Sequence, residues 1–235
     1  MSYMLMGDEE VEVDTEREFD LKQLPGFNYT IDKTWDGNPV THEPFTFEMK
    51  WLFQKIPGRP HKRVVVVEFE GPLFDDPEPE EMPGITPGLW NHEVVEFFFA
   101  NERNQYLEVE VGPHGHWLCL LFDGQRKTYN NGEELELVVS NKILGFDKWK
   151  CRLEIPLAYF PGNVTKFNSY AIHGTGENRV YEAYNPVTDG TFTEPDFHRL
   201  EFFKRFNRSK VIPDGYGTTS FVDWKYGNLW EGASK

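Results

Sequence analysis

Short apolar runs separated by turn residues fill the chain from residue 27 to residue 186. Many of these runs are rich in β-branched and aromatic residues, which favour strands. A series of such runs at roughly ten-residue spacing is typical of an antiparallel sandwich or barrel. In chain order the runs are FNYTI, FTFEMKWLF, RVVVVEFEG, VVEFFF, YLEVEV, HWLCLLF, LELVVS, KWKCRLEIP, SYAIHG and RVYEAYNP. The pattern therefore predicts an all-β fold.

The two ends of the chain differ from this body. Residues 1–26 are acidic and weakly patterned, which predicts an N-terminal extension, and residues 27–207 are predicted to form the β domain. The remaining segment, 208–235, is Gly-rich but also aromatic. Its large aromatic residues are Phe221, Trp224, Tyr226 and Trp230. We expect these side chains to dock on the domain, because disordered tails rarely contain so many aromatic groups.

Three segments between the runs have distinct patterns. The stretch 71–88 holds five prolines and five acidic residues, so it is predicted to be a long loop, either functional or mobile. The segment IPLAYFPGNV predicts one short helical turn that ends at Pro161. PDFHRLEFFKRF is compatible with a strand or with a second helical turn.

The segment VVEFFFANERNQYLEVEV predicts a β-hairpin whose loop is formed by residues 100–104. We expect Phe99 to pair with Gln105. The other expected pairs are Phe98 with Tyr106, Glu96 with Glu108, and Val94 with Glu110. The alternation of strand side chains then places Leu107, Val109 and Val111 in the core.

The same alternation gathers three acids and two aromatic residues on the opposite face: Glu96, Phe98, Tyr106, Glu108 and Glu110. Carboxylates that face each other across a strand pair cost about 0.2–1 kcal/mol. Lysine or arginine, a calcium ion or the hydroxyl groups of a polar ligand could compensate for this repulsion. The alternative is a plainly solvated face with screened charges. Aromatic rings beside carboxylates suit a saccharide, because its C–H faces stack and its hydroxyls donate hydrogen bonds.

Composition and charge narrow the possible partners. A chain of 235 residues is long enough for one large β domain. Its formal charge of −15 argues against binding to nucleic acid or to an anionic membrane surface. The sequence shows neither a secretory signal nor an apolar run long enough to span a membrane, and its two cysteines suggest no disulfide framework. We therefore expect a cytoplasmic protein.

Other candidate chemistry is weaker. His114 and His116 lie two residues apart and would need a third ligand to hold a metal. Cys119 lies in an apolar run and is predicted to be buried packing. GxSxG, HExxH and phosphate-binding glycine motifs do not occur in the sequence. An enzyme that uses opposed carboxylates such as Glu96 and Glu108, with a histidine, is a further possibility.

Five blocks of the sequence resemble an uncharacterised animal protein family of the chromosome 4 open reading frame 33 type. They are TWDGNPVTHEP, LWNHEVVEFFF, QYLEVEVGPHGHWLCLLF, FPGNVTKFNSYAIHG and PDFHRLEFF. The resemblance extends from about Ile31 to Phe206. That family is in turn similar, more distantly, to family 9 carbohydrate-binding modules and DOMON-like β-sandwiches.

The more distant likeness implies a single antiparallel β-sandwich. The matching positions are Trp90, Glu93, Glu96, Tyr106, Glu110, Pro113, Gly115, Phe167, Asn168, Pro195 and Phe197. Where the sugar-binding modules commonly end the late strand with arginine, this chain has His173. An imidazole offers at most two donors, whereas a guanidinium offers a fixed fork of five.

We therefore predict a non-catalytic β-sandwich that binds a small polar ligand, most plausibly a saccharide, on its concave face. The predicted ligand-binding residues are Trp90, Glu96, Phe98, Tyr106, Glu108, Glu110 and His173. Loop 71–88 is expected to form part of the rim, and calcium is a possible cofactor. The alternatives are an enzyme whose pocket is closed by this loop, and a protein-interaction domain that uses Trp224 and Trp230 of the tail.

Overall fold

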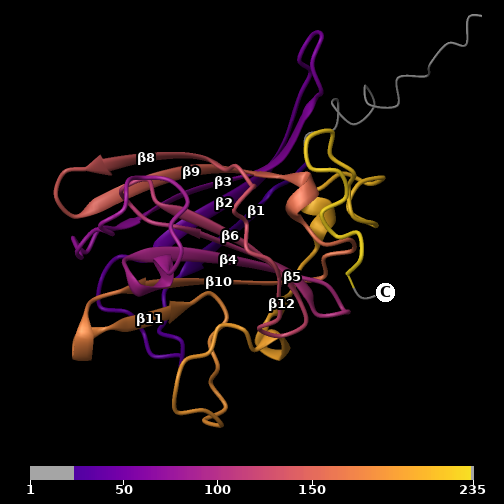
Figure 1. Cartoon of the computed structure of the whole chain (residues 1–235). Helices are drawn as coiled ribbons and strands as arrows, with labels where there is room; N and C mark the ends of the chain where they lie inside the picture. Colours follow the sequence, from indigo (N-terminus) through magenta and orange to yellow (C-terminus); the bar gives the residue numbers. More distant parts are fainter. Residues whose placement is uncertain (1–23, 234–235) are drawn as a thin grey trace, which may run out of the picture.

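The computed structural model describes residues 24–233, which form two β-sheets packed face to face (Figure 1). The first sheet has the strand order β1-β2-β3-β9-β8. The second has the order β11-β10-β4-β5-β6-β7, and β12 also pairs with β10. Neighbouring strands are antiparallel. This confirms the predicted antiparallel β-sandwich.

Most strands overlap the predicted apolar runs, but β8 is displaced toward the C-terminus from the run LELVVS, and β7 matches none of the runs. The strand bounds are β1 Phe27–Ile31, β2 Phe45–Gln54, β3 Lys62–Pro72, β4 Val94–Ala100, β5 Gln105–Val111, β6 Trp117–Asp123, β7 Thr128–Asn130, β8 Val138–Leu144, β9 Lys148–Pro156, β10 Lys166–His173, β11 Val180–Ala183 and β12 Lys204–Arg205. The 3-10 turns are η1 Leu89–Asn91, η2 Leu157–Tyr159, η3 Gly176–Asn178, η4 Leu200–Phe202 and η5 Arg208–Lys210. The helical turn before Pro161 is η2, and the segment PDFHRLEFFKRF contains both a helical turn, η4, and a short strand, β12.

The main core lies between the two sheets. Phe97 and Val109 enter it from the second sheet, and Met49 enters it from the first. Trp149 and Cys151 of β9 both point inward, as their spacing of two residues predicts. The inward side chains of each strand thus fill the space between the sheets, and the alternate residues of the second sheet are left on its outer face.

The β4–β5 hairpin has a different register from the predicted one. Its pairs include Ala100 with Tyr106, Phe99 with Leu107, Phe98 with Glu108 and Glu96 with Glu110, which is a shift of two residues. The turn is centred one residue later than expected: the Asn101 N–H donates to the carbonyl of Gln105, and Asn104 adopts a left-handed backbone with φ 60°. A shift of two residues keeps every side chain on its predicted face.

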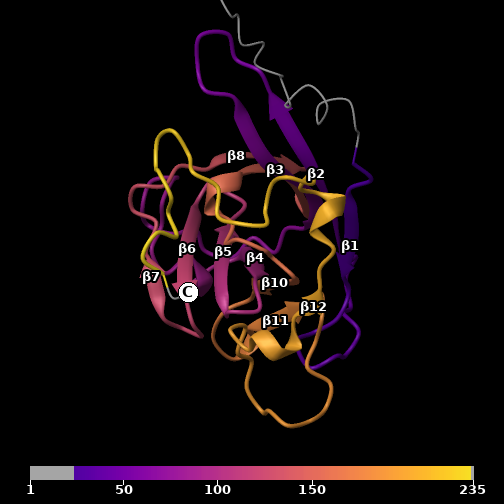
Figure 2. The same ribbon diagram turned by 90° about the vertical axis from the view of Figure 1, so that its right-hand side faces the viewer.

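The C-terminal segment packs against the sandwich through Trp230, and Phe221 and Tyr226 are also partly buried against the main core. Trp230 is buried, and its indole N–H donates to the carbonyl of Tyr159 at 3.3 Å. Its ring also stacks on Tyr129. Trp224, by contrast, is 71% exposed. Figure 2 shows this segment (yellow) crossing one side of the molecule, while the β2–β3 hairpin extends beyond the sandwich.

The predicted acidic extension falls almost entirely in residues 1–23, which lie outside the described residues. Both cysteines are free and buried. Within residues 24–233, we find no helix with the length and apolar character that crossing a membrane requires.

Candidate functional site

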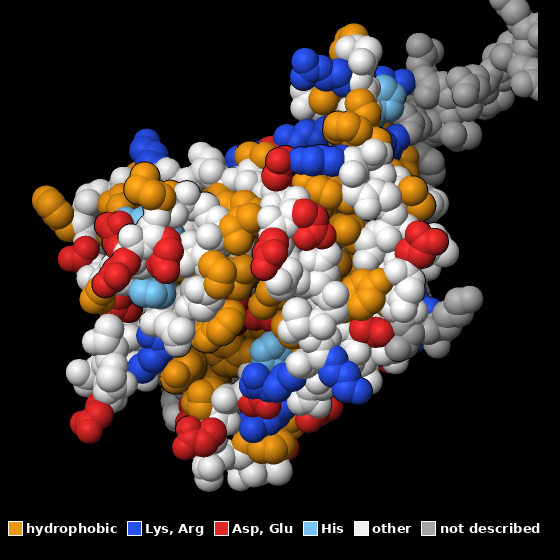
Figure 3. Space-filling view, viewed as in Figure 1, with side chains coloured by type: hydrophobic (Ala, Val, Ile, Leu, Met, Phe, Trp, Pro, Cys, Tyr) orange, Lys and Arg blue, Asp and Glu red, His pale blue; other side chains and the backbone are white. Residues whose placement is uncertain are grey.

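A pocket of about 670 Å³ opens on the outer face of the second sheet, away from the main core. Its floor includes Glu96 of β4, Glu108 of β5, and Leu120 and Phe122 of β6. Its walls come from the segments 90–91, 126–128, 175–181 and 195–198, which are loops, turns and the ends of short strands. The space-filling view shows a hollow in which hydrophobic side chains lie beside acidic, basic and histidine groups (Figure 3). The site therefore combines apolar surface with polar groups.

Glu96, Glu108 and Glu110 lie close together because the side chains of all three point to the outer face of the β4–β5 hairpin. Glu96 lies directly opposite Glu110, and Glu108 lies diagonally across from Glu96, opposite Phe98. Each of the three offers a carboxylate oxygen within 4.8 Å of the others. All three side chains are buried, and Glu110 is completely inaccessible to solvent. The predicted acidic face is therefore a dry carboxyl cluster.

Burial determines the protonation of this cluster. It raises the pKa of Glu108 to about 8, although the contact with Glu110 pulls in the other direction. Burial, together with the neighbouring carboxylates, holds the pKa of Glu96 and that of Glu110 well above the usual range. One oxygen of Glu108 and both oxygens of Glu110 have no hydrogen-bond partner among the described residues. The cluster is thus protonated at neutral pH, and its protons supply donors for these oxygens.

A histidine from residues 195–203, the late segment, lies beside the cluster. The Tyr106 hydroxyl accepts a hydrogen bond from the Arg126 N–H at 3.0 Å, so it donates its own proton to Nδ1 of His198 at 2.7 Å. Nε2 of His198 then carries the ring proton, and it lies 4.0 Å from an oxygen of Glu108. Burial and the Arg126 charge lower the pKa of His198 to about 4, which keeps the imidazole neutral.

Two arginines organise the rim. Arg126 forms an ion pair with Asp196 at 2.6 Å, which connects the β6–β7 loop to the late segment. Arg179 donates to the backbone carbonyls of Trp90, Asn91 and His92, so it ties the loop before β11 to η1. The side chain of Trp90 remains 46% exposed at the pocket edge. An aromatic surface is thus held in place by backbone contacts.

Four of the predicted binding residues do not line the pocket, and three of them lie on the outer face of β4 and β5. Phe98 and Tyr106 are fully buried in a second small core, where the segment 195–203 covers them. The expected aromatic platform is therefore wrong, because this covering segment makes both rings interior. Glu110 belongs to the carboxyl cluster but lies beneath the pocket surface.

His173 and loop 71–88 also lie away from the pocket. His173 is on the inner face of β10, where its ring stacks on Phe74 with centroids 3.5 Å apart. The loop is held by the buried carboxylate of Glu93, which accepts the N–H groups of Phe74 and Asp76. The expectation that this histidine and this loop form the rim is therefore wrong: both cover one end of the sandwich.

The residues that the sequence reasoning missed come from loops, apart from one at the start of β11. They are Arg126, Arg179, Tyr181, Asp196 and His198. The one available signal was the Pro195 and Phe197 pair, which the resemblance marked without assigning it a contact. Phe197 stacks on Tyr170 at 3.7 Å and carries the late segment over the outer face of the sheet.

Among the residues that the structure describes, two groups of side chains could hold a metal ion. Glu96, Glu108 and Glu110 offer only oxygen ligands, the type that calcium prefers, although calcium usually takes six to eight of them. Calcium therefore stays a prediction. The second group combines His42 and His173 with Glu182. The turn histidines His114 and His116 belong to neither group.

Comparison with known proteins places this architecture in a family. A search of protein-family models gives no match. The chain is 44% identical to the mouse UPF0462 protein C4orf33 homolog over 191 residues, which is 79% of this chain and 93% of the mouse protein. This chain belongs to the UPF0462 family. Human UPF0462 protein C4orf33 is 39% identical, with 86% of this chain and 96% of the human protein covered. The zebrafish member is 38% identical and is covered over its full length.

The fold of this UPF0462 member also matches a solved bacterial structure. That structure is of a candidate carbohydrate-binding protein from Bacteroides uniformis. The TM-score is 0.52, with 77% of this chain and 85% of the bacterial chain covered. Because the sequence identity is 18%, the likeness establishes the shared β-sandwich fold alone.

Proposed function

We propose that this protein binds a small polar ligand, and a saccharide best of all, in the pocket above Glu96 and Glu108. The observation that carries the proposal is a pair of buried carboxyl groups, whose pKa burial raises, at the base of a pocket whose walls include aromatic rings. A protonated carboxyl both donates and accepts hydrogen bonds, as does a sugar hydroxyl. The likeness to the bacterial candidate carbohydrate-binding protein supports the same choice. A cytoplasmic location is part of the proposal.

The wall residues suit the apolar C–H faces of a sugar ring. Trp90 is partly exposed at the edge, and Phe197 and Tyr181 lie within the lining. Their faces can pack against the C–H surface of a pyranose, as aromatic rings do in apolar contacts generally. Asp196, paired with Arg126, adds a fixed acceptor at the rim. Hydrogen bonds from below and stacking from the side would together orient a ring in this space.

Trp90→Ala is expected to weaken binding of the best saccharide from a glycan array by about fivefold, because it removes one stacking contact worth on the order of 1 kcal/mol. Isothermal titration calorimetry of the purified protein measures the change. Trp224→Ala is the matched control, because Trp224 is more exposed and lies outside the pocket. An array without any bound glycan, or an equal loss in both variants, would contradict a saccharide site here.

The same pocket supports a second candidate function, acid catalysis on a bound sugar. Glu108 is protonated at neutral pH and lies 4.0 Å from a neutral imidazole, His198, which is the type of paired site that general acids use. Chromogenic glycosides distinguish the two functions. Turnover that Glu108→Gln abolishes would favour catalysis, whereas saccharide binding without turnover would favour the binding function.

A further inference from the structure

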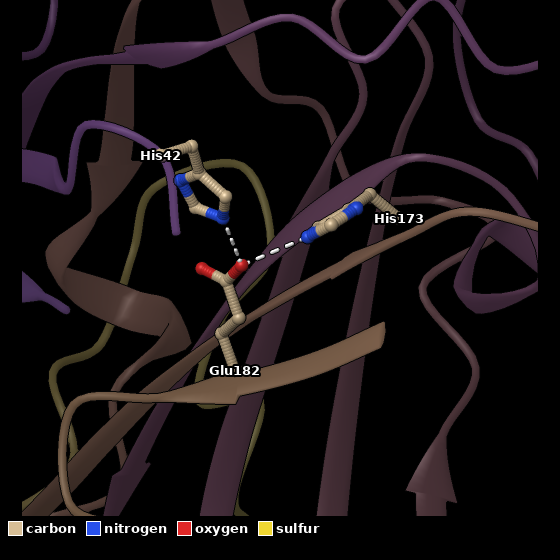
Figure 4. Close-up of side chains that lie close together, drawn as sticks. All are labelled: His42, His173 and Glu182. Carbon is tan, nitrogen blue, oxygen red and sulfur yellow. Dashed lines mark hydrogen bonds and ion pairs between the residues drawn. The ribbon is translucent and has the colours of Figure 1, made fainter. Parts of the chain in front are cut away.

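A second polar site lies on the inner face of the second sheet, where β10 ends and β11 begins. Nε2 of His42 lies 2.7 Å from Oε1 of Glu182, and Nε2 of His173 lies 2.8 Å from the same oxygen. Figure 4 shows both imidazoles directed at this single atom. The residues come from the β1–β2 loop, from β10 and from β11. Three separate elements thus converge on one carboxylate oxygen.

The hydrogen bonds around His42 leave a lone pair directed at the carboxylate. Nδ1 of His42 lies 2.8 Å from the backbone carbonyl of Glu43, which can only accept, so Nδ1 carries the proton. In the neutral ring, Nε2 is then an acceptor that faces another acceptor, Oε1 of Glu182. A proton or a metal ion has to lie between them: a second proton on the imidazole, a proton on the carboxyl group, or a bound cation.

The Glu182 carboxylate also lacks a donor or cation. Glu182 is completely buried, and its second oxygen, Oε2, has no hydrogen-bond partner among residues 24–233. A buried oxygen without a partner costs about 1–3 kcal/mol, and more when it is charged. A cation bound by the carboxylate and both imidazoles would compensate for this charge. We propose that His42, His173 and Glu182 bind one divalent transition-metal ion, for which zinc is the best fit.

The chemistry of the donors favours zinc over calcium or magnesium. Two imidazole nitrogens and one carboxylate oxygen form a recurrent zinc ligand set, whereas the harder ions prefer oxygen alone. Neighbouring ligands of a tetrahedral zinc lie roughly 3.3 Å apart, so the present contacts would open by about 0.6 Å when an ion enters. The side chain of His42 is 21% exposed, which leaves a path for the ion and a place for water as fourth ligand.

The surroundings hold the ligands in orientation, as outer-shell contacts do in metal sites. The Glu43 carbonyl fixes the His42 ring, and the Phe74 ring lies flat against His173. Phe74 is in turn fixed by its N–H bond to Glu93 at 3.0 Å. The long loop thus has a specific task at this end of the sandwich: it covers one imidazole ligand.

Zinc titration of the full-length chain, first stripped with a chelator, tests the proposal. We expect one equivalent of Zn²⁺ to bind in competition with a chromophoric chelator, and Co²⁺ to give the visible absorption of a four-coordinate site. His42→Ala and Glu182→Gln should each weaken Zn²⁺ binding by about 100-fold or more, because each removes a ligand. His114→Ala is the matched control, since His114 also lies near a carboxylate, that of Glu78, at 3.3 Å.

A second measurement keeps the test valid if a variant misfolds. In the wild-type protein, Zn²⁺ should shift the imidazole NMR signals of His42 and His173 and leave those of His114 unchanged. Glu96→Gln should retain the full affinity, which separates this site from the carboxyl cluster. Absence of Zn²⁺ binding, or equal affinity in the His42→Ala and His114→Ala proteins, would overturn the proposal and leave a shared proton between His42 and Glu182 in place of a metal ion.

Discussion

Raising the pH from 6.5 to 8.5 is expected to destabilise the folded protein by about 2 kcal/mol through Glu108 alone. The folded pKa of Glu108, about 8, lies above its unfolded value of 4.5. Its contribution to stability is therefore fully present below pH 4.5 and is lost as the pH rises through about 8. Glu96 and Glu110, whose pKa values are also raised by burial, act in the same direction.

At lower pH, stability depends on a different titrating group. His198 acts in the opposite direction, because burial lowers its pKa from 6.5 to about 4. Its contribution to stability is present above pH 6.5 and is lost as the pH falls toward 4. Glu93, whose pKa burial raises to about 7, adds to the loss of stability on the alkaline side. Urea unfolding at pH 6.5 and pH 8.5 therefore isolates the effect of the acids from that of the histidine.

Glu110→Gln should make this pH dependence shallower and raise stability at pH 8.5 by on the order of 2 kcal/mol. The amide has the shape of the carboxyl and donates a hydrogen bond to its neighbours without a proton to lose. Glu201→Gln, a change of an exposed residue, is the control and should leave the pH dependence unchanged. If wild-type stability is flat between these pH values, or if Glu110→Gln falls as steeply, then the three carboxyls do not share protons as described.

The alternation of strand residues was sufficient to predict which way the hairpin side chains point. Val109 enters the core, and Glu108 and Glu110 face away from it, because a strand reverses its side chains at every residue. The pairing partners were wrong by two residues, since they depend on the left-handed backbone of Asn104, which the sequence permits but does not require. The face is therefore more predictable than the register.

The sequence of a strand does not reveal which distant segment will cover its outer face. Phe98 was read as a ligand platform, but the segment 195–203, about a hundred residues later, makes it interior. The side-chain direction of His173 could have been inferred, because Tyr170 and Ile172 alternate with it in β10 and face outward. Its partners could not, since His42 arrives from a loop with no periodic pattern. Contacts made by loop residues are therefore the part of these sites that the sequence does not predict.

Tyr106→Ala is expected to cost about 3–5 kcal/mol of unfolding free energy, because it opens a cavity in the second core. The Tyr106 ring stacks on Phe122 with centroids 4.5 Å apart, and its hydroxyl connects Arg126 to His198. Tyr106→Phe keeps the ring and should cost only about 1 kcal/mol for the lost hydrogen bonds. Urea unfolding at pH 6.5, where the acid cluster is protonated, measures both values.

The pair of variants also separates packing from ligand contact. If Tyr106 stacked on a ligand from an open surface, its replacement by alanine would leave stability within about 0.5 kcal/mol of wild type and abolish binding. A buried Tyr106 predicts the reverse order of effects, in which the alanine variant is strongly destabilised. The phenylalanine variant then remains folded but loses the contact that orients His198 beside Glu108. A change in saccharide affinity in that variant, without a matching loss of stability, would show that the second core serves the pocket by positioning its histidine.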